Sequence, residues 1–385
     1  MPESRRQSDD RLRLTRLACG LSQGDLARTA GVTRQAISGI ESGRWSPSLE
    51  VALSLAKALD SSVEELFGGV GDAPSVQARL AVRQPRPVGN AAGPSRLLVS
   101  EIAGDVVVYP LMGDHAMVPG FAPAIATAPP PPGDQPELET VGSGTRGRRR
   151  SHVVDAELIT SPSPALAVAG CDPALALLKG PLERHDPPVG LNWWSCCNTT
   201  ALELLESGTV HAAAVHRNSD QRARHRPGIE VVGFASWREG LVVAPRFCGR
   251  VRTLQDVIGN GVRIVNRDVG SEARRLLDEE MGRLRVEPAS VPGYETVCSA
   301  HLLVTSSIAT GLADAGISTE PAALAYGLDF YPWQQEISEL HIPRSLVGSP
   351  EVKALLDVLA GRELPAQLAA LDGYDAKPCG RILAA

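Results

Sequence analysis

The feature that most constrains the fold of this 385-residue chain is a pair of capped helical segments near its N-terminus. Ser22 is placed to accept hydrogen bonds from the first N–H groups of SQGDLARTA, and Gly31 supplies the left-handed residue that ends this segment. Thr33 has the same capping position before TRQAISGIES, which Gly43 closes. Two helices joined by a Gly-Val pair, the second with its own cap, predict a helix-turn-helix.

Three further helical segments surround this pair. Leu12, Leu14 and Leu17 predict a buried apolar face on a helix that precedes it. After it, Ser48 caps SLEVALSLAKALD, and SVEELF is a short last helix. The sequence therefore predicts an all-α domain of five helices over residues 8–68.

The second helix of a helix-turn-helix lies in the major groove of DNA, with its first residues against the base edges. An Arg side chain can hold guanine and a Gln side chain adenine, each through two hydrogen bonds. Arg34 and Gln35 are therefore expected to read bases, together with Thr33 and Ser38. Gln23, at the start of the preceding helix, is expected to face a phosphate.

The segment LSQGDLARTAGVTRQAISGIESGRWSPSLEVALSLAKALDSSVEELF closely resembles the Cro/C1-type helix-turn-helix, also called the xenobiotic-response-element family. The shared pattern comprises LxQ, LA, GVTRQ, IE, PS, LAKAL and LF. The resemblance implies a protein that binds double-stranded DNA. It implies base contacts from Thr33, Arg34, Gln35 and Ser38 and phosphate contacts from Gln23, Ser42 and Arg44. Gly39 departs from the pattern, because many relatives have a polar base reader there.

The charge balance limits how tightly one copy can hold DNA. Residues 1–70 contain nine Lys or Arg and nine Asp or Glu, and the whole chain has a formal net charge of -6. Phosphate neutralisation supplies much of the affinity for DNA, so one copy is expected to bind modestly. A homodimer on two half-sites would compensate. The RGRRR run at 146–150 would add a phosphate contact or form only an exposed loop.

The middle of the chain differs in amino-acid composition from both ends. Residues 69–96 are rich in Pro, Gly and Ala and are expected to form a linker. In residues 97–152, SRLLVSEIAGDVVVYPL predicts two short strands joined by Ala-Gly-Asp. The following APPPPGDQPELETVGSGTRGRRRS is low in complexity and is expected to be a disordered insertion.

From residue 153 onward, short apolar runs alternate with amphipathic helical runs. ALAVAG (165–170) precedes DPALALLK, and VRIVNR precedes GSEARRLLDEEMG. This alternation predicts βαβ units and a mainly parallel sheet. Several strand ends lead into helices that begin with small polar residues, where free N–H groups and the helix dipole favour an anion.

This layout resembles the type 2 periplasmic-binding-protein fold, with one lobe at about 153–232 and 319–385 and the other at about 233–318. GCDPALALL, NRDVGSEARRLLDEEM, SAHLLVTSSIATGLADAGIS and LAALDGYD further resemble the molybdate-binding-protein-like domain that occurs fused to helix-turn-helix modules. The resemblance implies a small effector between the lobes, such as a tetrahedral oxyanion or a small anionic metabolite. The candidate ligand-binding residues are Cys171, Ser195, Thr199, Arg267, Ser271, Arg274, Ser299 and Tyr326.

Some of these candidates have a purely structural alternative. Asp172, also at this strand end, is expected to cap its helix, because a carboxylate beside an anion is unfavourable. Ser271 is an N-cap by position, and Arg274 would equally suit the surface of a helix. Cys196-Cys197 is expected to be a pair of small buried residues in a turn, although thiol-based sensing stays open.

Catalytic and metal-binding patterns are missing from the sequence. It contains no Walker, GxGxxG-after-strand or HExxH motif, and its seven cysteines include no CxxC spacing. His211 and His216 lie five apart in a strand-like run and therefore face opposite sides, so neither a metal site nor a cofactor is predicted. With no apolar run of about 18–20 residues, neither a membrane span nor a membrane partner is expected.

These features together predict a cytoplasmic one-component regulator, not an enzyme. A five-helix DNA-binding domain, a small β segment and a two-lobed α/β ligand-sensing domain follow one another along the chain. Two alternatives stay open: the C-terminal domain acts on its ligand as an enzyme, or it senses oxidants through Cys196 and Cys197.

Overall fold

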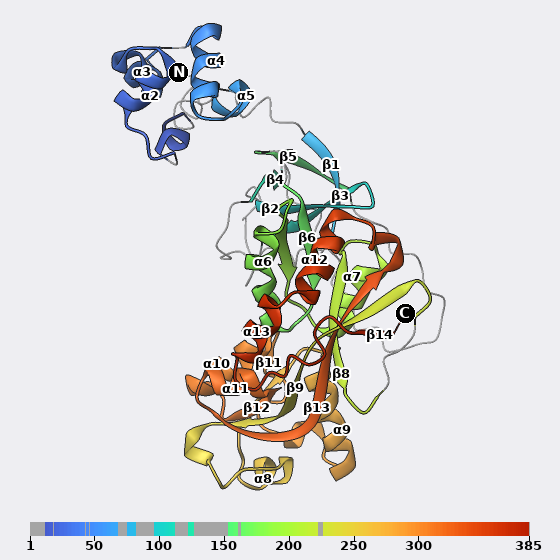
Figure 1. Cartoon of the computed structure of the whole chain (residues 1–385). Helices are drawn as coiled ribbons and strands as arrows, with labels where there is room; N and C mark the ends of the chain where they lie inside the picture. The colour runs from blue at the N-terminus through green and yellow to red at the C-terminus, as the bar shows by residue number, and fades with distance from the viewer. Residues whose placement is uncertain are drawn as a thin grey trace.

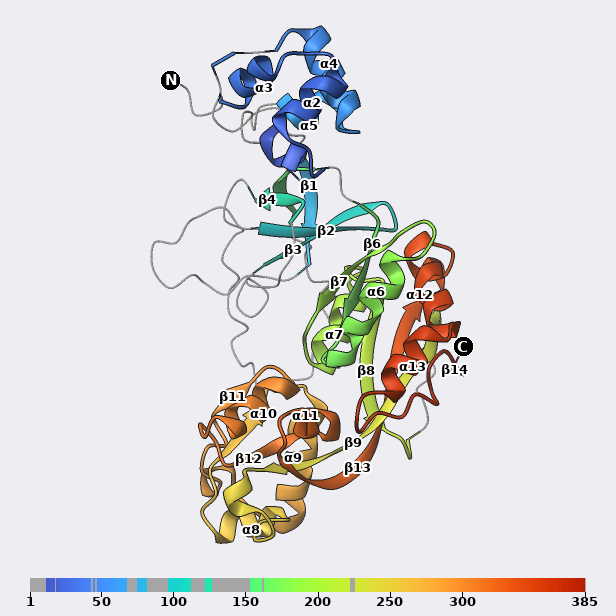
Figure 2. The ribbon, with the colours of Figure 1, turned by 60° about the vertical axis from the view of Figure 1, so that its left-hand side comes forward.

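The computed structural model consists of three parts in chain order: a helical domain, a small β-barrel and a two-lobed α/β domain (Figures 1 and 2). The structure describes residues 12–17, 19–42, 44–45, 47–67, 75–81, 96–111, 122–126, 153–160, 163–221 and 226–384. The RGRRR run and most of the Pro-rich segment lie outside these residues.

The helical domain forms as its capping residues predict. A helix at residues 12–17 precedes α2 (Gln23–Ala30), α3 (Arg34–Glu41), α4 (Leu49–Ala58) and α5 (Val63–Phe67). Ser22 and Asp25 form a reciprocal capping box at α2, and Gly31 ends that helix at φ 71°. The Thr33 side chain accepts a hydrogen bond from the backbone N–H of Ala36. The helix-turn-helix prediction is confirmed.

The first helix buries a different face from the one expected. Leu12 is fully buried, but Leu14 and Leu17 are 63% and 52% exposed. Arg16, one turn after Leu12, is buried instead, and its Nε donates to Glu41 Oε1 at 2.6 Å. The expected apolar stripe was therefore wrong, because an internal ion pair occupies the position one turn beyond Leu12.

Five short strands close into a barrel between the helical domain and the lobes (Figure 2). They are β1 (Ser75–Leu80), β2 (Arg96–Ile102), β3 (Asp105–Pro110), β4 (Ala124–Ala126) and β5 (Val153–Leu158), in the order β1-β3-β2-β4-β5. The β2–β3 hairpin was expected, and Ala103 and Gly104 make its turn at positive φ. β1 lies in the predicted linker and β5 in the predicted start of the ligand domain. These two strands pair with each other, which closes the barrel.

The barrel shares a core with the first lobe. Ile102, Val107 and Tyr109 pack into the same buried cluster as the strands of that lobe. The Tyr109 hydroxyl donates to the backbone oxygen of Thr209, and Asn192 Nδ2 donates to the backbone oxygen of Val99 at 2.8 Å. The barrel and the first lobe are therefore joined through buried contacts.

One nine-stranded sheet runs through both lobes, in the order β11-β10-β12-β9-β13-β8-β6-β7, with β14 paired to β9. Its strands are β6 (Ala165–Ala169), β7 (Gly190–Trp194), β8 (Ala212–Asn218), β9 (Ile229–Val243), β10 (Ile264–Arg267), β11 (Val297–Cys298), β12 (Ala315–Thr319), β13 (Asp329–Pro343) and β14 (Ile382–Ala384). β6 is parallel to β7 and β8, as the βαβ pattern predicts, and β10 is parallel to β11 and β12.

Two 15-residue antiparallel strands, β9 and β13, connect the lobes (Figure 1). Lobe 1 carries the 3-10 helix η3 (Pro173–Leu178) and helices α6 (Lys179–Glu183), α7 (Asn198–Glu206), α12 (Pro350–Ala360) and α13 (Glu363–Ala369). Lobe 2 carries α8 (Leu254–Gly259), α9 (Glu272–Leu284), α10 (His301–Ala309) and α11 (Glu320–Ala325). Since α11 contacts α10 and β12, lobe 2 continues past the boundary expected at residue 318. None of the helices in the described part of the chain combines the length and apolar character needed to cross a membrane.

Candidate functional site

The start of α3 is exposed in the part of the chain that the structure describes. Arg34 and Gln35 are exposed at its first two positions, and Ser38 lies one turn further on, half-buried. Thr33 is exposed, and its hydroxyl is already used as the helix cap. The structure thus presents Arg34 and Gln35 at the end of the helix where base readers are expected.

The residues predicted to contact phosphates have local partners in this structure. Gln23 Nε2 donates to Glu41 Oε2 at 2.8 Å. Ser42 Oγ donates to the backbone oxygen of Ser38 at 2.7 Å, and Arg44 Nε donates to Ser42 Oγ at 2.8 Å. Arg44 and Ser42 are exposed and lie just beyond the C-terminal end of α3.

Gly39 has a packing role that the sequence did not indicate. A Cβ atom there would lie 2.5 Å from Cε3 of the Trp45 ring, and the backbone N–H of Trp45 donates to the backbone oxygen of Gly39. The indole therefore covers the helix surface where relatives carry a polar reader. Trp45 is 56% exposed, so the solvent-facing surface over Gly39 is formed by the Trp45 ring.

The Arg16–Glu41 pair ties the first helix to the end of α3. Burial alone would raise the pKa of Glu41, but hydrogen bonds from Arg16 and Gln23 lower it below its ordinary value. Arg16 also donates to the backbone oxygen of Leu21 at 2.7 Å. The ionised Glu41 side chain therefore holds the first helix and α2 against the end of α3.

The two lobes touch each other where α7 meets the turn before α9. The backbone N–H of Thr199 and its hydroxyl both approach the backbone oxygen of Gly270, at 3.4 and 3.1 Å. Gly270 has φ 93°, and a Cβ there would lie 2.8 Å from Thr199 Oγ1. A groove of about 610 Å³ beside this contact is lined by the start of α7 and one face of α9. We call the arrangement with this contact closed.

Arg267 is the most deeply buried of the predicted ligand residues. It ends β10 with only 1% of its surface exposed. Its Nε lies 3.2 Å from Asp268 Oδ1, and its Nη2 donates to the backbone oxygen of Ser299 at 3.2 Å. Its Nη1 is buried and has no hydrogen-bond partner among the described residues.

Two other predicted residues serve the structure of α9. Ser271 is buried and caps this helix by accepting from the backbone N–H of Arg274. The guanidinium of Arg274 pairs with Asp278 at 3.1 Å and lies 4.1 Å from the centre of the Tyr294 ring. Both residues also line the groove beside the lobe contact, so their role in ligand binding stays a prediction.

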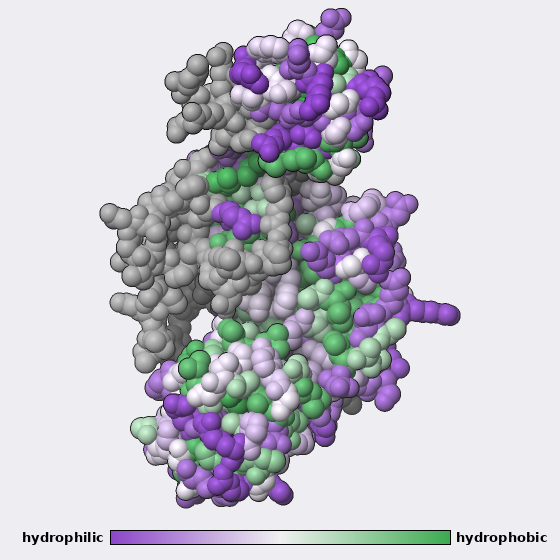
Figure 3. Space-filling view, turned by 90° about the vertical axis from the view of Figure 1, so that its left-hand side faces the viewer, coloured by the Kyte–Doolittle hydropathy of each residue, from purple (hydrophilic) through white to green (hydrophobic). Residues whose placement is uncertain are grey.

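The remaining predicted residues are dispersed. Ser195 is half-buried in the segment between β7 and α7, and Ser299 is exposed after β11. Tyr326 is 43% exposed at the end of α11. Leu302 and Leu303 on α10 and Leu324 on α11 are also partly exposed, and Figure 3 shows hydrophobic residues on the upper side of lobe 2.

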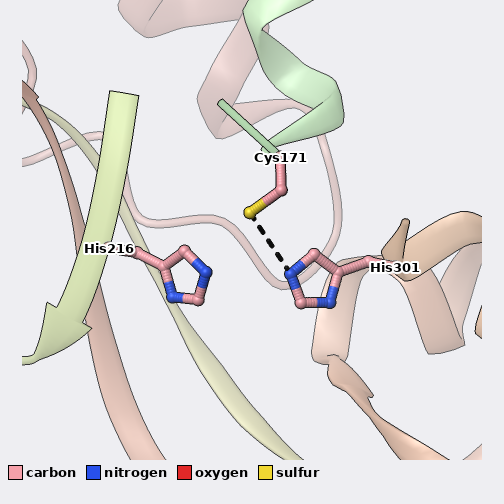
Figure 4. Close-up of side chains that lie close together, drawn as sticks. All are labelled: Cys171, His216 and His301. Atoms are coloured by element: carbon pink, nitrogen blue, oxygen red, sulfur yellow. Dashed lines mark hydrogen bonds between the residues drawn. The ribbon is translucent and has the colours of Figure 1, made fainter. Parts of the chain in front are cut away.

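A buried polar cluster lies where β9 and β13 pass between the lobes. Cys171 Sγ, at the end of β6, is 3.7 Å from His301 Nε2 on α10 (Figure 4). His216 Nδ1, on β8, is 2.9 Å from Glu336 Oε2 on β13. Glu239 on β9 is fully buried, and neither of its carboxyl oxygens has a hydrogen-bond partner among the described residues.

The cluster shifts the ionisation of its members in opposite directions. Burial, with smaller contributions from Glu336 and Glu272, raises the pKa of Glu239 to about 8. Burial alone would lower the pKa of His216, but Cys171, Glu336 and Glu239 raise it well above its ordinary value. Burial and the charge of Arg267 lower the pKa of His301 well below that value.

Asp172 joins this cluster as a helix cap. Its Oδ1 accepts from the backbone N–H of Ala174 at 3.0 Å and from the Tyr374 hydroxyl at 2.7 Å. The capping role expected from the sequence is therefore present. Its Oδ2 is buried without a hydrogen-bond partner in the described residues, and burial raises the pKa of the carboxyl group.

The vicinal cysteines lie next to this cluster but do not form part of it. Burial raises the pKa of Cys196 well above its ordinary value, and it also raises that of Cys197. Cys197 Sγ lies 3.4 Å from Thr200 Oγ1 in the turn before α7. Since thiolates are the reactive species, raised pKa values disfavour redox chemistry at this pair.

Sequence reasoning missed most of the buried cluster. His216 was considered only with His211, whose Nδ1 accepts from the backbone N–H of Ala167 in the core of lobe 1. Glu239, His301 and Glu336 were not singled out. Their signal was present in the sequence: charged residues inside otherwise apolar strand runs rarely become buried without a partner.

The chain matches known families in two separate regions. Residues 12–66 match the helix-turn-helix family and residues 179–360 match the PBP superfamily domain. An uncharacterised HTH-type transcriptional regulator of Methanocaldococcus jannaschii is 40% identical over 58 residues, which cover 15% of this chain and 88% of that relative. The restriction-modification controller protein C.AhdI of Aeromonas hydrophila is 44% identical over 16% of this chain and 92% of its own, with a TM-score of 0.16.

Two further relatives share longer segments with this chain. The uncharacterised protein YvgK of Bacillus subtilis is 33% identical over 146 residues, and the match spans 38% of this chain but only 47% of YvgK. An uncharacterised protein from the 5′ region of a ferredoxin gene of Clostridium pasteurianum is 37% identical over 109 residues, 28% of this chain and 96% of its own.

Fold and sequence matches together define a DNA-binding helix-turn-helix joined to a two-lobed domain that matches the PBP superfamily. The chain belongs to the XRE/Cro-type helix-turn-helix transcriptional regulators and carries a PBP superfamily domain.

Proposed function

We propose that this protein is a one-component regulator in which a small effector bound between the two lobes changes the affinity of the helix-turn-helix for its operator. The buried polar atoms without partners at the junction of the lobes carry this proposal: Arg267 Nη1, both carboxyl oxygens of Glu239 and Asp172 Oδ2. A buried polar group without a partner costs about 1–3 kcal/mol. An effector that satisfies such groups would therefore gain affinity from them.

An effector with an anionic group, such as a tetrahedral oxyanion, is the best chemical match to Arg267. A guanidinium binds oxyanions through several N–H groups, and Nη1 is free to donate. Asp172 and Glu239 oppose a bare anion wherever they are ionised, so a positive charge beside the effector would strengthen its binding.

The barrel offers a route from effector to DNA. Effector binding favours the lobe arrangement that it fits best, and this shifts the population of closed molecules. Because lobe 1 and the barrel share a core, lobe movement displaces the barrel that follows the DNA-binding domain in the chain. In a homodimer, this displacement would change the spacing of the two α3 helices and so the operator affinity, by about 1–3 kcal/mol for ordinary coupling.

Fluorescence anisotropy with the full chain and DNA from its own promoter region tests this function. Molybdate, tungstate, sulfate and phosphate are added separately, and their binding is followed in parallel by calorimetry. We expect at least one to bind and to change the DNA affinity about 5–150-fold. Arg267→Gln should abolish the response, whereas Arg283→Gln, on the exposed side of α9, should keep it. An anion that binds the protein and leaves the DNA affinity unchanged would contradict the proposal.

One observation favours a second function, catalysis on the bound ligand. Cys171 Sγ and His301 Nε2 are 3.7 Å apart, so a thiol and a base do meet. A product formed from a bound ligand by the wild type, but not by Cys171→Ala, would support this enzyme. Recovery of the ligand unchanged after prolonged incubation would exclude it for that ligand.

A further inference from the structure

Three side chains from distant segments converge at the junction of the lobes. Cys171 follows β6, His216 lies on β8 and His301 is the first residue of α10. All three are buried, and one potential ligand atom from each lies within 4.8 Å of the other two. Figure 4 shows the Cys171 sulfur and ring nitrogens of both histidines turned toward a common space.

We propose that Cys171, His216 and His301 bind a borderline transition-metal ion such as Zn²⁺. Zn–S and Zn–N bonds of about 2.3 and 2.0–2.1 Å at tetrahedral angles place the sulfur and nitrogen about 3.6 Å apart. The observed distance from Cys171 Sγ to His301 Nε2 is 3.7 Å. The two atoms therefore already have the separation of neighbouring ligands around one ion.

The Nδ1 atom of each imidazole, on the side away from the proposed ion, lies near an oxygen atom, as is usual for metal-bound histidines. His216 Nδ1 lies 2.9 Å from Glu336 Oε2. His301 Nδ1 lies 3.5 Å from Ser318 Oγ and 3.9 Å from Glu239 Oε1. Metal-bound histidines usually donate their second ring N–H to a carboxylate or another oxygen, which fixes the tautomer. This arrangement leaves the Nε2 atom of His301 and the inward nitrogen of His216 for the ion.

The surrounding charge also favours a cation. Glu239 and Glu336 are fully buried, and Asp172 is 2% exposed. Neither oxygen of Glu239 has a hydrogen-bond partner in the described part of the chain. Arg267, with 1% exposure, is a cation beside these three carboxyl groups and the thiol, and His216 gives up any proton on its inward nitrogen when it binds the ion. A buried dication offsets this excess, whereas an isolated buried carboxylate is strongly unfavourable.

The ligand types select the class of metal. A thiolate and two imidazoles suit Zn²⁺ and its neighbours Co²⁺, Ni²⁺ and Cu²⁺, whereas Mg²⁺ and Ca²⁺ prefer oxygen ligands. Three protein ligands leave the fourth tetrahedral position open, as in sites that bind a water or a small ligand. Metal binding goes beyond the proposed regulation and does not depend on it. If the effector binds the ion at its fourth coordination position, that part of the inference does rest on the proposed function.

Cobalt binding by the full chain tests the site directly. The protein is stripped with a chelator, kept reduced and titrated with Co²⁺, whose thiolate charge-transfer absorption reports a bound cysteine. We expect about one Co²⁺ per chain, a charge-transfer band and displacement by Zn²⁺. Cys171→Ala should remove the band, and His301→Gln should weaken Co²⁺ binding at least 10-fold. Cys379→Ala should leave both unchanged, because that half-buried thiol faces the backbone oxygen of Leu359.

Several results would overturn this assignment. One is a stripped wild-type protein that binds no Co²⁺ or shows no charge-transfer band. Another is a band that persists in Cys171→Ala and disappears in Cys379→Ala. If Cys171→Ala does not fold, by circular dichroism, the wild-type titration and His301→Gln still decide. Operator binding is measured separately. If the protein binds no metal ion but its effector still changes the DNA affinity, the metal-site inference is wrong and the proposed regulation stands.

Discussion

Replacing Gly270 by alanine should loosen the contact between the lobes. Gly270 has φ 93°, and a Cβ there would lie 2.8 Å from Thr199 Oγ1 and 2.9 Å from Thr199 Cβ. Relief of this overlap moves the turn away from α7, which lengthens the two hydrogen bonds to the Gly270 oxygen. At about 1 kcal/mol each, the closed arrangement loses about 1–2 kcal/mol, or about 5–30-fold in its equilibrium with the open one.

Gly311→Ala is the matched control. Gly311 also lies in lobe 2 with φ 78°, but among the described residues no atom beyond its chain neighbours lies within 4 Å of its would-be Cβ. Both variants therefore carry the cost of a side chain at positive φ, about 1–2 kcal/mol. Only Gly270→Ala adds the collision between the lobes.

Hydrogen exchange at the Thr199 amide reads out this contact. This N–H lies in the first turn of α7, where it has no partner within the helix, and it points at the Gly270 oxygen. Site-resolved mass spectrometry should show exchange about 5–30-fold faster in Gly270→Ala than in Gly311→Ala. Equal exchange rates in the two variants would refute the view that Gly270 holds the lobes together.

Four other predictions concern the DNA-binding domain and the barrel. Arg34→Ala should lose about 1–3 kcal/mol of discrimination at one base pair, seen in anisotropy with single-substituted operators, because Arg34 is exposed and contributes no core packing. Arg16→Met leaves Glu41 buried without its cation and should destabilise the helical domain by about 3 kcal/mol in denaturant unfolding. Since the pKa of Glu41 is lowered in the folded state, the wild-type domain should lose stability as pH falls through that pKa, and Glu41→Gln should flatten this dependence. Tyr109→Phe removes the buried hydrogen bond to Thr209 and should weaken barrel docking by about 1–2 kcal/mol, measured as faster proteolysis between them.

Local signals predicted the helical domain well. The caps Ser22 and Thr33 and the turn at Gly31 act within a few residues of themselves, so a single sequence reveals them. The burial of Arg16 could not be predicted from neighbouring residues in the sequence. Its partner Glu41 lies 25 residues further along the chain, and only the tertiary fold brings the two together.

The barrel shows a similar limit. The β2–β3 hairpin was predictable because its partners are adjacent in the chain and Ala103-Gly104 suits a tight turn. β1 was not, because it pairs in register with β5, which lies more than 70 residues later. Its Pro- and Gly-rich surroundings indicate a linker, and the alternation of Val76, Ala78 and Leu80 is too short to outweigh them.

The candidate site was predicted only in part. Arg267 was identified because it ends a strand before a helix, and it proves to be buried with a free Nη1. Arg274 satisfied the same pattern but pairs with Asp278 on its own helix. The cluster around His216 joins residues from β6, β8, β9, α10 and β13, and no spacing rule connects segments so far apart.

The most direct test of the central claim compares the operator affinity of one protein preparation with and without its bound ligand. The ligand carried through purification is identified by native mass spectrometry, removed by dialysis and then restored. The proposed regulation predicts that restoring it changes the dissociation constant for promoter DNA about 5–150-fold in the wild type and less in Gly270→Ala. A ligand that rebinds stoichiometrically while the dissociation constant for DNA stays the same would contradict the proposal.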